Sequence, residues 1–336
     1  MDSLGVAIVG LGIGRRHIQA YQSIPGVRVV AVADLDEAAR ERERREAGIP
    51  FASADYRQAI ARDDVQLVSI CTPDRFHAEQ ALFALDAGKH VLCEKPLALT
   101  MEEAAALVAK VRQTGLKLMV GHNYRFSPQF RKVKEMVDVG AVGPLLFAES
   151  SYVQDLYFME KLGPDYWRLK DPQDFVLGGA IHNVDLLRWI VGEVEEVHAY
   201  ANHGMPFYPL DDNYCINLCF AGGRIGRLLL LLGSRLKDKF YVDLGVYGPE
   251  GSLRAIMQRD EVIANIDRAE GEKPETISTP AANSHALEIA YWVDCVRNDR
   301  QPTPNVIDGA RAVAVCLAAI RSAREGRPVA VEYGLL

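Results

Sequence analysis

A lysine and a glutamate stand together where a short apolar segment, residues 91–93, runs into Glu94, Lys95 and Pro96. The segment has the composition of a buried strand, and in an open α/β sheet ligands bind at the carboxyl ends of the strands. A lysine held there, beside a carboxylate and partly removed from water, can exchange protons near neutral pH. Lys95 is therefore a candidate acid/base group. The alternative is an ordinary solvated lysine at a strand end.

Glycines near the start of the chain point to a second kind of chemistry. Residues 6–9 are apolar, and Gly10, Gly12 and Gly14 follow before a segment of helical character. A strand, a glycine-rich turn and a helix in this order bind a pyrophosphate through backbone N–H groups and the helix N-terminus. Gly14 stands one residue before the usual third glycine of this pattern, whose place Arg15 takes. The sequence thus predicts a dinucleotide site with a shortened glycine pattern.

Asp34 ends the next predicted strand, residues 27–33. It follows Gly14 by about 20 residues, the spacing of the carboxylate that binds the adenosine ribose hydroxyls. A carboxylate there repels the 2′-phosphate of NADP, and Leu35 beside it adds no positive charge, so NAD is the expected cofactor. The alternative is an aspartate that only caps the helix after it.

His182 and Asp185 are the candidate chemical groups of the second half of the chain. In a helix that starts near residue 180, they lie three residues apart and present an imidazole and a carboxylate to one side. The alternative is a histidine that only bonds its neighbours near a helix start.

The elements that must position these groups alternate between strand and helix up to residue 121, which predicts a parallel, doubly wound sheet. From residue 145 onward, strand-like segments dominate, and helices return at residues 284–298 and 308–325. We expect an α/β protein with two domains. Residues 1–121 form an N-terminal Rossmann domain, and residues 122–336 form a C-terminal α+β domain with an open, mostly antiparallel sheet. Six strands are predicted in this sheet, at 145–154, 194–202, 212–220, 225–233, 241–247 and 251–257.

Composition limits the classes of function. A chain of 336 residues with 49% hydrophobic and 25% charged residues is typical of a globular protein of two domains. A net charge of −7 argues against binding to nucleic acid. No apolar run is long enough to span a membrane and no basic segment opens the chain, so a cytoplasmic protein is expected. The six cysteines are expected to be buried and reduced, with no bound metal.

These motifs together resemble the Gfo/Idh/MocA oxidoreductases, the relatives of glucose-fructose oxidoreductase and inositol dehydrogenase. The resemblance rests on the glycine loop followed by His17, on Thr72-Pro73 with His77, and on Glu94-Lys95-Pro96. It implies that Lys95 contacts the reacting hydroxyl beside the nicotinamide of NAD and that His182 is a second catalytic residue. The cofactor-binding residues that it implies are Gly10, Gly12, Ile13, Gly14, Asp34, Thr72, Pro73, His77, Glu94, Lys95 and Asn123. The substrate-binding residues that it implies are Asn123, Tyr166, Trp167, Arg168 and Asp185.

One position departs from this resemblance, because Gly178 stands where much of the family has an aspartate four residues before the histidine. The expected activity is reversible hydride transfer between NAD(H) and a hydroxyl carbon of a sugar, cyclitol or related polyol, carried out by a homodimer or homotetramer. Two alternatives stay open. One is a redox-neutral lyase or glycosidase-like relative that retains NAD, and the other is a non-catalytic, nucleotide-sensing regulator.

Overall fold

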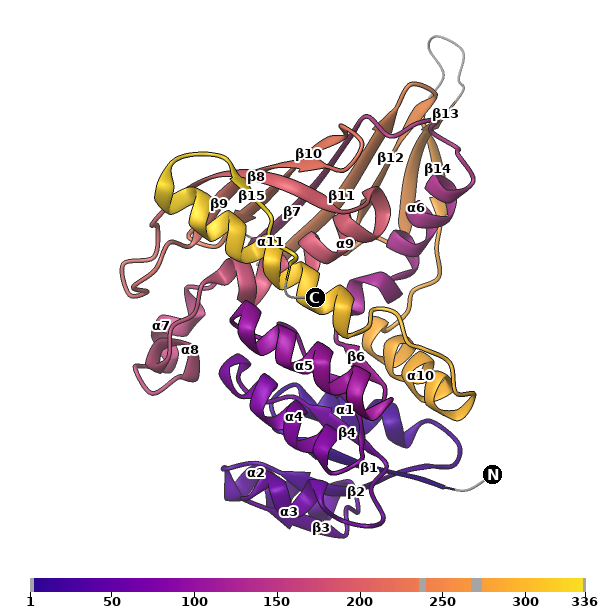
Figure 1. Cartoon of the computed structure of the whole chain (residues 1–336), viewed down its shortest axis with the longest axis vertical. Coiled ribbons are helices and arrows are strands. Elements are labelled where there is room, and N and C mark those ends of the chain that lie inside the picture. Colours follow the sequence, from indigo (N-terminus) through magenta and orange to yellow (C-terminus); the bar gives the residue numbers. More distant parts are fainter. Residues whose placement is uncertain (1–2, 236–239, 267–273, 335–336) are drawn as a thin grey trace. The chain divides into compact units, whose positions relative to one another are not determined.

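The computed structural model describes residues 3–235, 240–266 and 274–334, which form two compact units (Figure 1). Unit 1 contains Met1–Asn123, Asn283–Val313 and Gly334–Leu336, and unit 2 contains Tyr124–Ala282 and Ala314–Tyr333. The single division at residue 121 that the sequence predicts therefore differs from the structure. Helix α10 (Ser284–Arg297) packs against α1 (Gly14–Gln22) and buries Trp292, which places this late segment in the N-terminal unit.

Unit 1 is built on a six-stranded sheet with the order β3-β2-β1-β4-β5-β6. All neighbouring pairs are parallel. The strands are nearly continuous apolar runs, as expected when helices cover both faces of a sheet. This confirms the predicted doubly wound sheet, whose carboxyl edge is where ligands bind. The strands are β1 (Leu4–Val9), β2 (Val27–Ala33), β3 (Phe51–Ser53), β4 (Leu67–Ile70), β5 (His90–Cys93) and β6 (Leu118–Val120).

Helices connect these strands and begin where the local sequence caps them. Helix α5 (Met101–Thr114) starts after Thr100, whose side chain accepts a hydrogen bond from the backbone N–H of Glu103, and ends at Gly115 with φ 68°. The sequence did not predict the short strand β3 or the short helix α3. The other helices of this part are α2 (Glu37–Glu46), α3 (Tyr56–Ile60), the 3₁₀ turn η1 (Asp74–Phe76) and α4 (His77–Asp86).

Unit 2 is built on a nine-stranded sheet with the order β14-β13-β12-β11-β7-β10-β9-β8-β15. Every neighbouring pair is antiparallel except β7 and β10, which are parallel. This confirms the predicted open, mostly antiparallel sheet, although the sequence did not predict β13, β14 and β15. The strands are β7 (Phe147–Gln154), β8 (Val194–Asn202), β9 (Asn213–Phe220), β10 (Ile225–Leu231), β11 (Phe240–Gly248), β12 (Gly251–Ile256), β13 (Glu261–Ile266), β14 (Glu275–Ser278) and β15 (Val329–Ala330).

Helix α9 (Ile181–Val191) contacts strand β7 and follows a π-helical turn, η3 (Val176–Ala180). Every residue of this helix except Trp189 is buried. The remaining elements are the 3₁₀ turn η2 (Asn123–Phe126), α6 (Pro128–Asp138), α7 (Phe158–Leu162), α8 (Trp167–Lys170) and α11 (Val306–Glu325).

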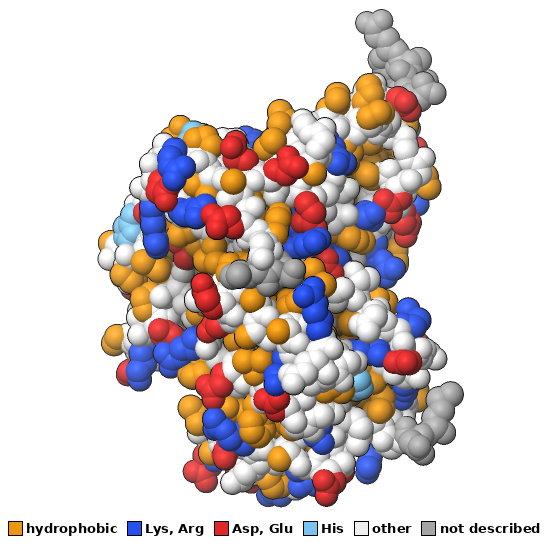
Figure 2. All heavy atoms as spheres, in the orientation of Figure 1, with side chains coloured by type: hydrophobic (Ala, Val, Ile, Leu, Met, Phe, Trp, Pro, Cys, Tyr) orange, Lys and Arg blue, Asp and Glu red, His pale blue; other side chains and the backbone are white. Residues whose placement is uncertain are grey.

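Acidic and basic side chains are interspersed over the face of the molecule that Figure 2 shows. Within the described residues, no helix combines the length and apolar character needed to cross a membrane. Four cysteines are buried as expected, whereas Cys215 is exposed and Cys219 half-buried on strand β9. These two side chains correct the expectation of six buried thiols.

Candidate active site

The glycine loop has the geometry of a phosphate-binding turn. Gly10 has φ 89°, and a Cβ there would lie 2.6 Å from the carbonyl carbon of Cys71. A Cβ on Gly14 would lie 2.9 Å from Cγ2 of Ile8, so Gly14 permits the close packing of α1 on β1. Apart from Gly12 and its two chain neighbours, no residue in the described part of the chain has an atom within 4 Å of a Cβ built on Gly12. The loop therefore leaves room for a pyrophosphate, and Gly14 does the work of the usual third glycine.

Asp34 is tied directly to this loop. Its Oδ2 accepts a hydrogen bond of 2.6 Å from the N–H of Leu11, and its Oδ1 accepts one of 2.9 Å from the N–H of Asp36. The carboxylate is half-buried at the end of β2. A guanidinium nitrogen of Arg40 donates to the carbonyl of Asp34 at 2.6 Å, a contact that sequence reasoning missed. This geometry fits a ribose whose hydroxyls donate to the carboxylate beside the phosphate loop.

His77 lies between two strand ends. Its Nδ1 is 2.7 Å from the carbonyl oxygen of Pro96, and its Nε2 is 2.8 Å from that of Thr72. The ring is buried, and the Lys95–Pro96 peptide bond is cis. Both ring nitrogens face backbone carbonyls, which gives His77 a structural role, and its predicted contact with the cofactor stays a prediction. The ring links the Thr72-Pro73 turn after β4 to the Lys95-Pro96 turn after β5.

Glu94 is buried beneath the turn that carries Lys95. Its Oε1 accepts a hydrogen bond of 3.1 Å from Nε2 of the buried His17, and its Oε2 accepts one of 3.3 Å from the backbone N–H of Lys95. Burial alone would raise the pKa of Glu94. The hydrogen bond from His17 and the charges of His17, Lys95 and His285 outweigh burial and lower this pKa to about 2. The ionised carboxylate thus holds the lysine turn in place.

Helix α10 brings residues from the last quarter of the chain to this part of unit 1. Asn123 donates a hydrogen bond of 2.9 Å from Nδ2 to Oγ of Ser284. His285 lies close enough for its charge to act on Glu94, and burial lowers the pKa of its imidazole. Sequence reasoning missed Ser284 and His285, because no local pattern connects them with the glycine loop.

In unit 2, the ring of His182 is stacked on the ring of Tyr124. The ring centroids are 4.3 Å apart and the planes differ by 17°. Both side chains are buried, and burial raises the pKa of the Tyr124 hydroxyl well above its usual value. Tyr124 was not among the residues that the sequence predicts for the site.

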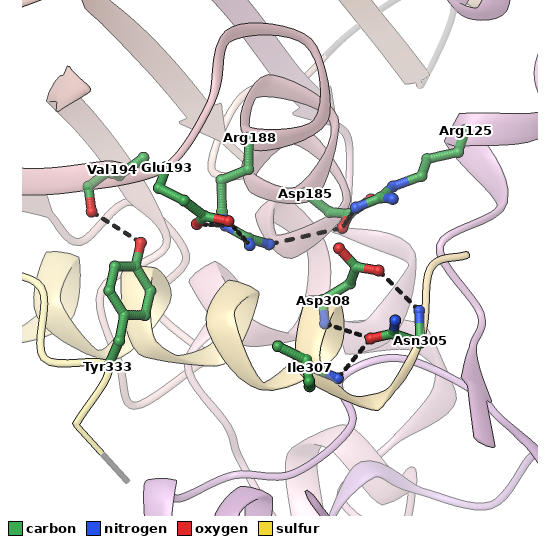
Figure 3. A network of polar contacts seen from close by, with 9 residues as sticks. All are labelled: Arg125, Asp185, Arg188, Glu193, Val194, Asn305, Ile307, Asp308 and Tyr333. Carbon is green, nitrogen blue, oxygen red and sulfur yellow. Dashed lines mark hydrogen bonds and ion pairs between the residues drawn. The ribbon is translucent and has the colours of Figure 1, made fainter. Parts of the chain in front are cut away.

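Asp185 is held by Arg125 rather than presented to a ligand (Figure 3). Its Oδ2 and Oδ1 accept hydrogen bonds of 2.7 Å from Nε and Nη2 of Arg125. Arg188 lies 4.0 Å from the same carboxylate and makes its own pair with Glu193, at 2.9 Å. The carboxylate of Asp185 is thus buried in an ion pair, and the substrate contact predicted for it stays a prediction.

Tyr166, Trp167 and Arg168 lie together at α8. The guanidinium of Arg168 is 4.1 Å from the centre of the Trp167 ring, and the rings of Tyr166 and Trp167 are 6.1 Å apart. The charge of Arg168 also acts on the hydroxyl of Tyr152, whose pKa burial raises to about 12. A Cβ on Gly179 would lie 3.3 Å from the Tyr152 ring. Tyr152 therefore packs beside the turn that leads into α9, within the electrostatic reach of Arg168.

Asp174 does not replace the carboxylate that Gly178 lacks. Its Oδ1 accepts from the N–H of Val176 at 2.9 Å, and its Oδ2 accepts from the hydroxyl of Tyr214 at 2.7 Å. The bond from Val176 caps the π-helical turn that precedes α9, and the bond from Tyr214 joins this turn to strand β9. Burial raises the pKa of Asp174.

The structure brings the predicted residues together in two groups, one in each unit. Unit 1 holds the predicted cofactor-binding residues at the carboxyl ends of the parallel strands β1, β2, β4, β5 and β6. These residues are the glycine loop, Asp34, Thr72, Glu94, Lys95 and Asn123. Unit 2 holds His182, which is stacked on Tyr124, and it also contains the α8 residues 166–168. Over the described ranges, no group of three or more His, Cys, Asp or Glu side chains could hold a metal ion.

Two family models match the chain. The model of an oxidoreductase family with an NAD-binding Rossmann fold, GFO_IDH_MocA, matches residues 4–122. The model of the C-terminal alpha/beta domain of the same family matches residues 134–331. Together the matches cover most of both units.

Curated relatives and solved structures match between three quarters and nearly all of the chain. Inositol 2-dehydrogenase of Rubrobacter xylanophilus is 30% identical over 344 residues, covering 98% of this chain and 94% of the relative. Levoglucosan dehydrogenase of Pseudarthrobacter phenanthrenivorans is 30% identical over 292 residues, covering 75% and 73%. A structure of levoglucosan dehydrogenase in complex with NADH and levoglucosan superposes with a TM-score of 0.92 at 25% identity, covering 99% of this chain and all of the other.

Proposed function

Because the chain belongs to the Gfo/Idh/MocA family of NAD-binding oxidoreductases, we propose that it transfers a hydride reversibly between NAD(H) and a hydroxyl carbon of a sugar, cyclitol or related polyol. The observation that carries the proposal is the position of Lys95. It follows strand β5, beside the buried carboxylate of Glu94, at the sheet edge that also bears the glycine loop and Asp34. The polyol class rests on relatives named as levoglucosan and inositol dehydrogenases.

The residues of the chain bind, orient and exchange protons. The glycine loop and Asp34 hold the pyrophosphate and the ribose, and bound NAD supplies the hydride acceptor. Lys95 takes the proton of the substrate hydroxyl and stabilises the negative charge that develops on its oxygen. Glu94 keeps the lysine turn in position, and His182 is the second group of the relay through which this single proton is exchanged with the substrate. Asn123, Tyr166, Trp167 and Arg168 contact the substrate hydroxyls and carbon faces.

The site is also proposed to work in an oligomer located in the cytoplasm. Tyr200 on β8 and Ile225 on β10 are large apolar side chains exposed on the sheet of unit 2, which supports a second copy of the chain as their partner. Analytical ultracentrifugation is expected to show a homodimer or homotetramer. A monomer at micromolar concentration would contradict this part of the proposal. The buried free thiols of Cys71, Cys93, Cys295 and Cys316 support a reducing compartment.

The test is a screen of sugars, cyclitols and related polyols with NAD, followed by NADH absorbance. We expect at least one compound to yield NADH in proportion to the substrate consumed, with Lys95→Met as the control for contaminating dehydrogenases. Consumption of substrate without net NADH would favour the redox-neutral alternative. No turnover of any compound, together with tight NAD binding, would favour the nucleotide-sensing regulator.

A further inference from the structure

The 3₁₀ turn η2 presents two successive side chains to two residues of α9 that lie one helical turn apart. Tyr124 stacks on His182, with 4.3 Å between the ring centroids. Arg125 forms two hydrogen bonds of 2.7 Å with Asp185. Residues i and i+3 of a helix share a face, so the two contacts act on the same side of α9. The turn η2 thus contacts helix α9 at two points, through Tyr124 and through Arg125.

The second contact, between Arg125 and Asp185, fixes the position of η2 on α9. Arg125 and Asp185 are buried, and the planar guanidinium meets the carboxylate in a bidentate pair that permits one relative orientation. The network continues through Arg188 to Glu193, so that two arginines face two acids (Figure 3). The guanidinium of Arg125 also lies 5.7 Å from the ring centre of Trp189, one turn further along α9. Sliding of α9 against the turn would leave buried charges unpaired, which is strongly unfavourable.

The first contact, between Tyr124 and His182, orients the imidazole ring. A ring stacked nearly parallel to Tyr124 cannot turn out of that plane without losing the contact, because Tyr124 is itself buried and packs against Phe130. The nitrogens of His182 are therefore held along fixed directions in one plane, and one face of the ring is covered. A reactive group has to be held in this way, since small errors in position cost much of the rate.

We propose that Tyr124 is a positioning residue for His182, and that the Arg125–Asp185 pair is the anchor that keeps Tyr124 in place. This inference rests on the proposed function, in which His182 exchanges a proton with the substrate. Asp185 then serves the reaction through α9 and Arg125, without touching the substrate.

The test separates positioning from general stability by a double-mutant cycle. Tyr124→Leu removes the stacked ring and should lower kcat by about 10- to 100-fold, the range set by a misplaced catalytic group, while the dissociation constant for NADH stays within about twofold. Tyr124→Phe keeps the ring and should retain kcat within about threefold. In a His182→Ala background, Tyr124→Leu should cause no further loss, because the residue through which it acts is gone.

The matched control is Tyr208→Leu, which removes another buried tyrosine of unit 2, one whose ring pairs with Phe175. It should lower the melting temperature and leave kcat near the wild-type value. Proton NMR of histidine-labelled protein gives a readout without turnover. The His182 ring protons should be shifted by the Tyr124 ring in the wild type and in Tyr124→Phe, and should lose this shift in Tyr124→Leu. Tyr124→Met repeats both measurements if the leucine variant does not fold.

Three outcomes would overturn the inference. They are an additive loss from Tyr124→Leu in the His182→Ala background, an equal loss of kcat in Tyr208→Leu, and wild-type kcat in Tyr124→Leu when His182→Ala is impaired. Unchanged turnover in His182→Ala would instead contradict the role of His182 in the proposed function, and the positioning role of Tyr124 with it.

Discussion

Arg125 and Asp185 form a bidentate ion pair in which both hydrogen bonds are 2.7 Å long and the side chains are only 6% and 1% exposed. The pair joins residues that are 60 positions apart in the sequence. A carboxylate placed three residues after a catalytic histidine looks like a ligand for the substrate when only the sequence is known. Its bond to Arg125 makes it part of the framework that holds α9.

Breaking this pair is expected to destabilise the protein strongly. Asp185→Asn leaves the buried Arg125 without an opposite charge and should cost about 3–5 kcal/mol of unfolding free energy, seen as a lower melting temperature. Arg227→Met is the control, because Arg227 also forms an ion pair, with Glu149, but its own side chain is 56% exposed. That change should cost no more than about 1 kcal/mol. Similar melting temperatures for the two variants would show that the buried pair adds little.

The hydrogen bond between His17 and Glu94 should make the unfolding free energy depend on pH in the acid range. The pKa of Glu94 falls from the ordinary value of 4.5 to about 2 in the folded protein, so the unfolded state binds a proton more readily. The resulting stabilisation, about 3 kcal/mol, is fully present above pH 4.5 and is lost as the pH falls from 4.5 towards 2.

Unfolding by denaturant at a series of pH values measures this effect. Glu94→Gln should be less stable than the wild type at pH 7 and should show a flatter dependence on pH below 4.5. Glu79→Gln, which changes an exposed carboxylate on α4, should leave the slope unchanged. If the unfolding free energy of Glu94→Gln depends on pH below 4.5 as steeply as that of the wild type, another carboxylate causes the loss of stability in acid.

The cofactor preference depends on Asp34. Asp34→Ala removes the acceptor for the ribose and a charge that repels the 2′-phosphate of NADP. It should weaken NADH binding by about tenfold, the value of one charge-assisted hydrogen bond, and narrow the difference between NADH and NADPH. Fluorescence titration measures both dissociation constants. Asp36→Ala, which removes the neighbouring cap of α2, should leave the ratio of the two constants unchanged. Tighter binding of NADPH by the wild type would contradict the assignment.

Lys95 is expected to carry the proton transfer. Lys95→Met keeps the length of the side chain but deletes the ammonium, and should slow single-turnover hydride transfer by at least about 10²-fold while NAD still binds. Lys95→Arg should not restore the rate, because a guanidinium stays protonated. Lys89→Met is the control, since Lys89 donates to the carbonyls of Arg62 and Val65, away from the glycine loop. If Lys95→Met slows single-turnover hydride transfer by less than a few-fold, Lys95 does not carry the proton transfer.

Much of the nucleotide-binding half could be predicted because its signals are local. The glycine turn, the strand that ends at Asp34 and the capped helix after Thr100 each lie within a few residues, where backbone preferences dominate. The structure adds that Gly14 itself permits the packing of α1 on β1, so the shortened pattern keeps a glycine at this close contact. The edge strands β14 and β15 were not predicted, because short edge strands carry a weak alternating pattern, and neither was β13 beside β14.

Which side chains meet was decided only by the tertiary structure. His17 and Glu94 are 77 residues apart, Arg125 meets Asp185, and helix α10 joins the N-terminal unit although it comes from the last quarter of the chain. The sequence by itself determined the family resemblance, the parallel sheet and the candidates Lys95 and His182. It could not show that His77 faces two carbonyls or that Asp185 is bound to an arginine. The strength of a charged contact depends on burial and geometry, and neither is encoded in the spacing of residues along the chain.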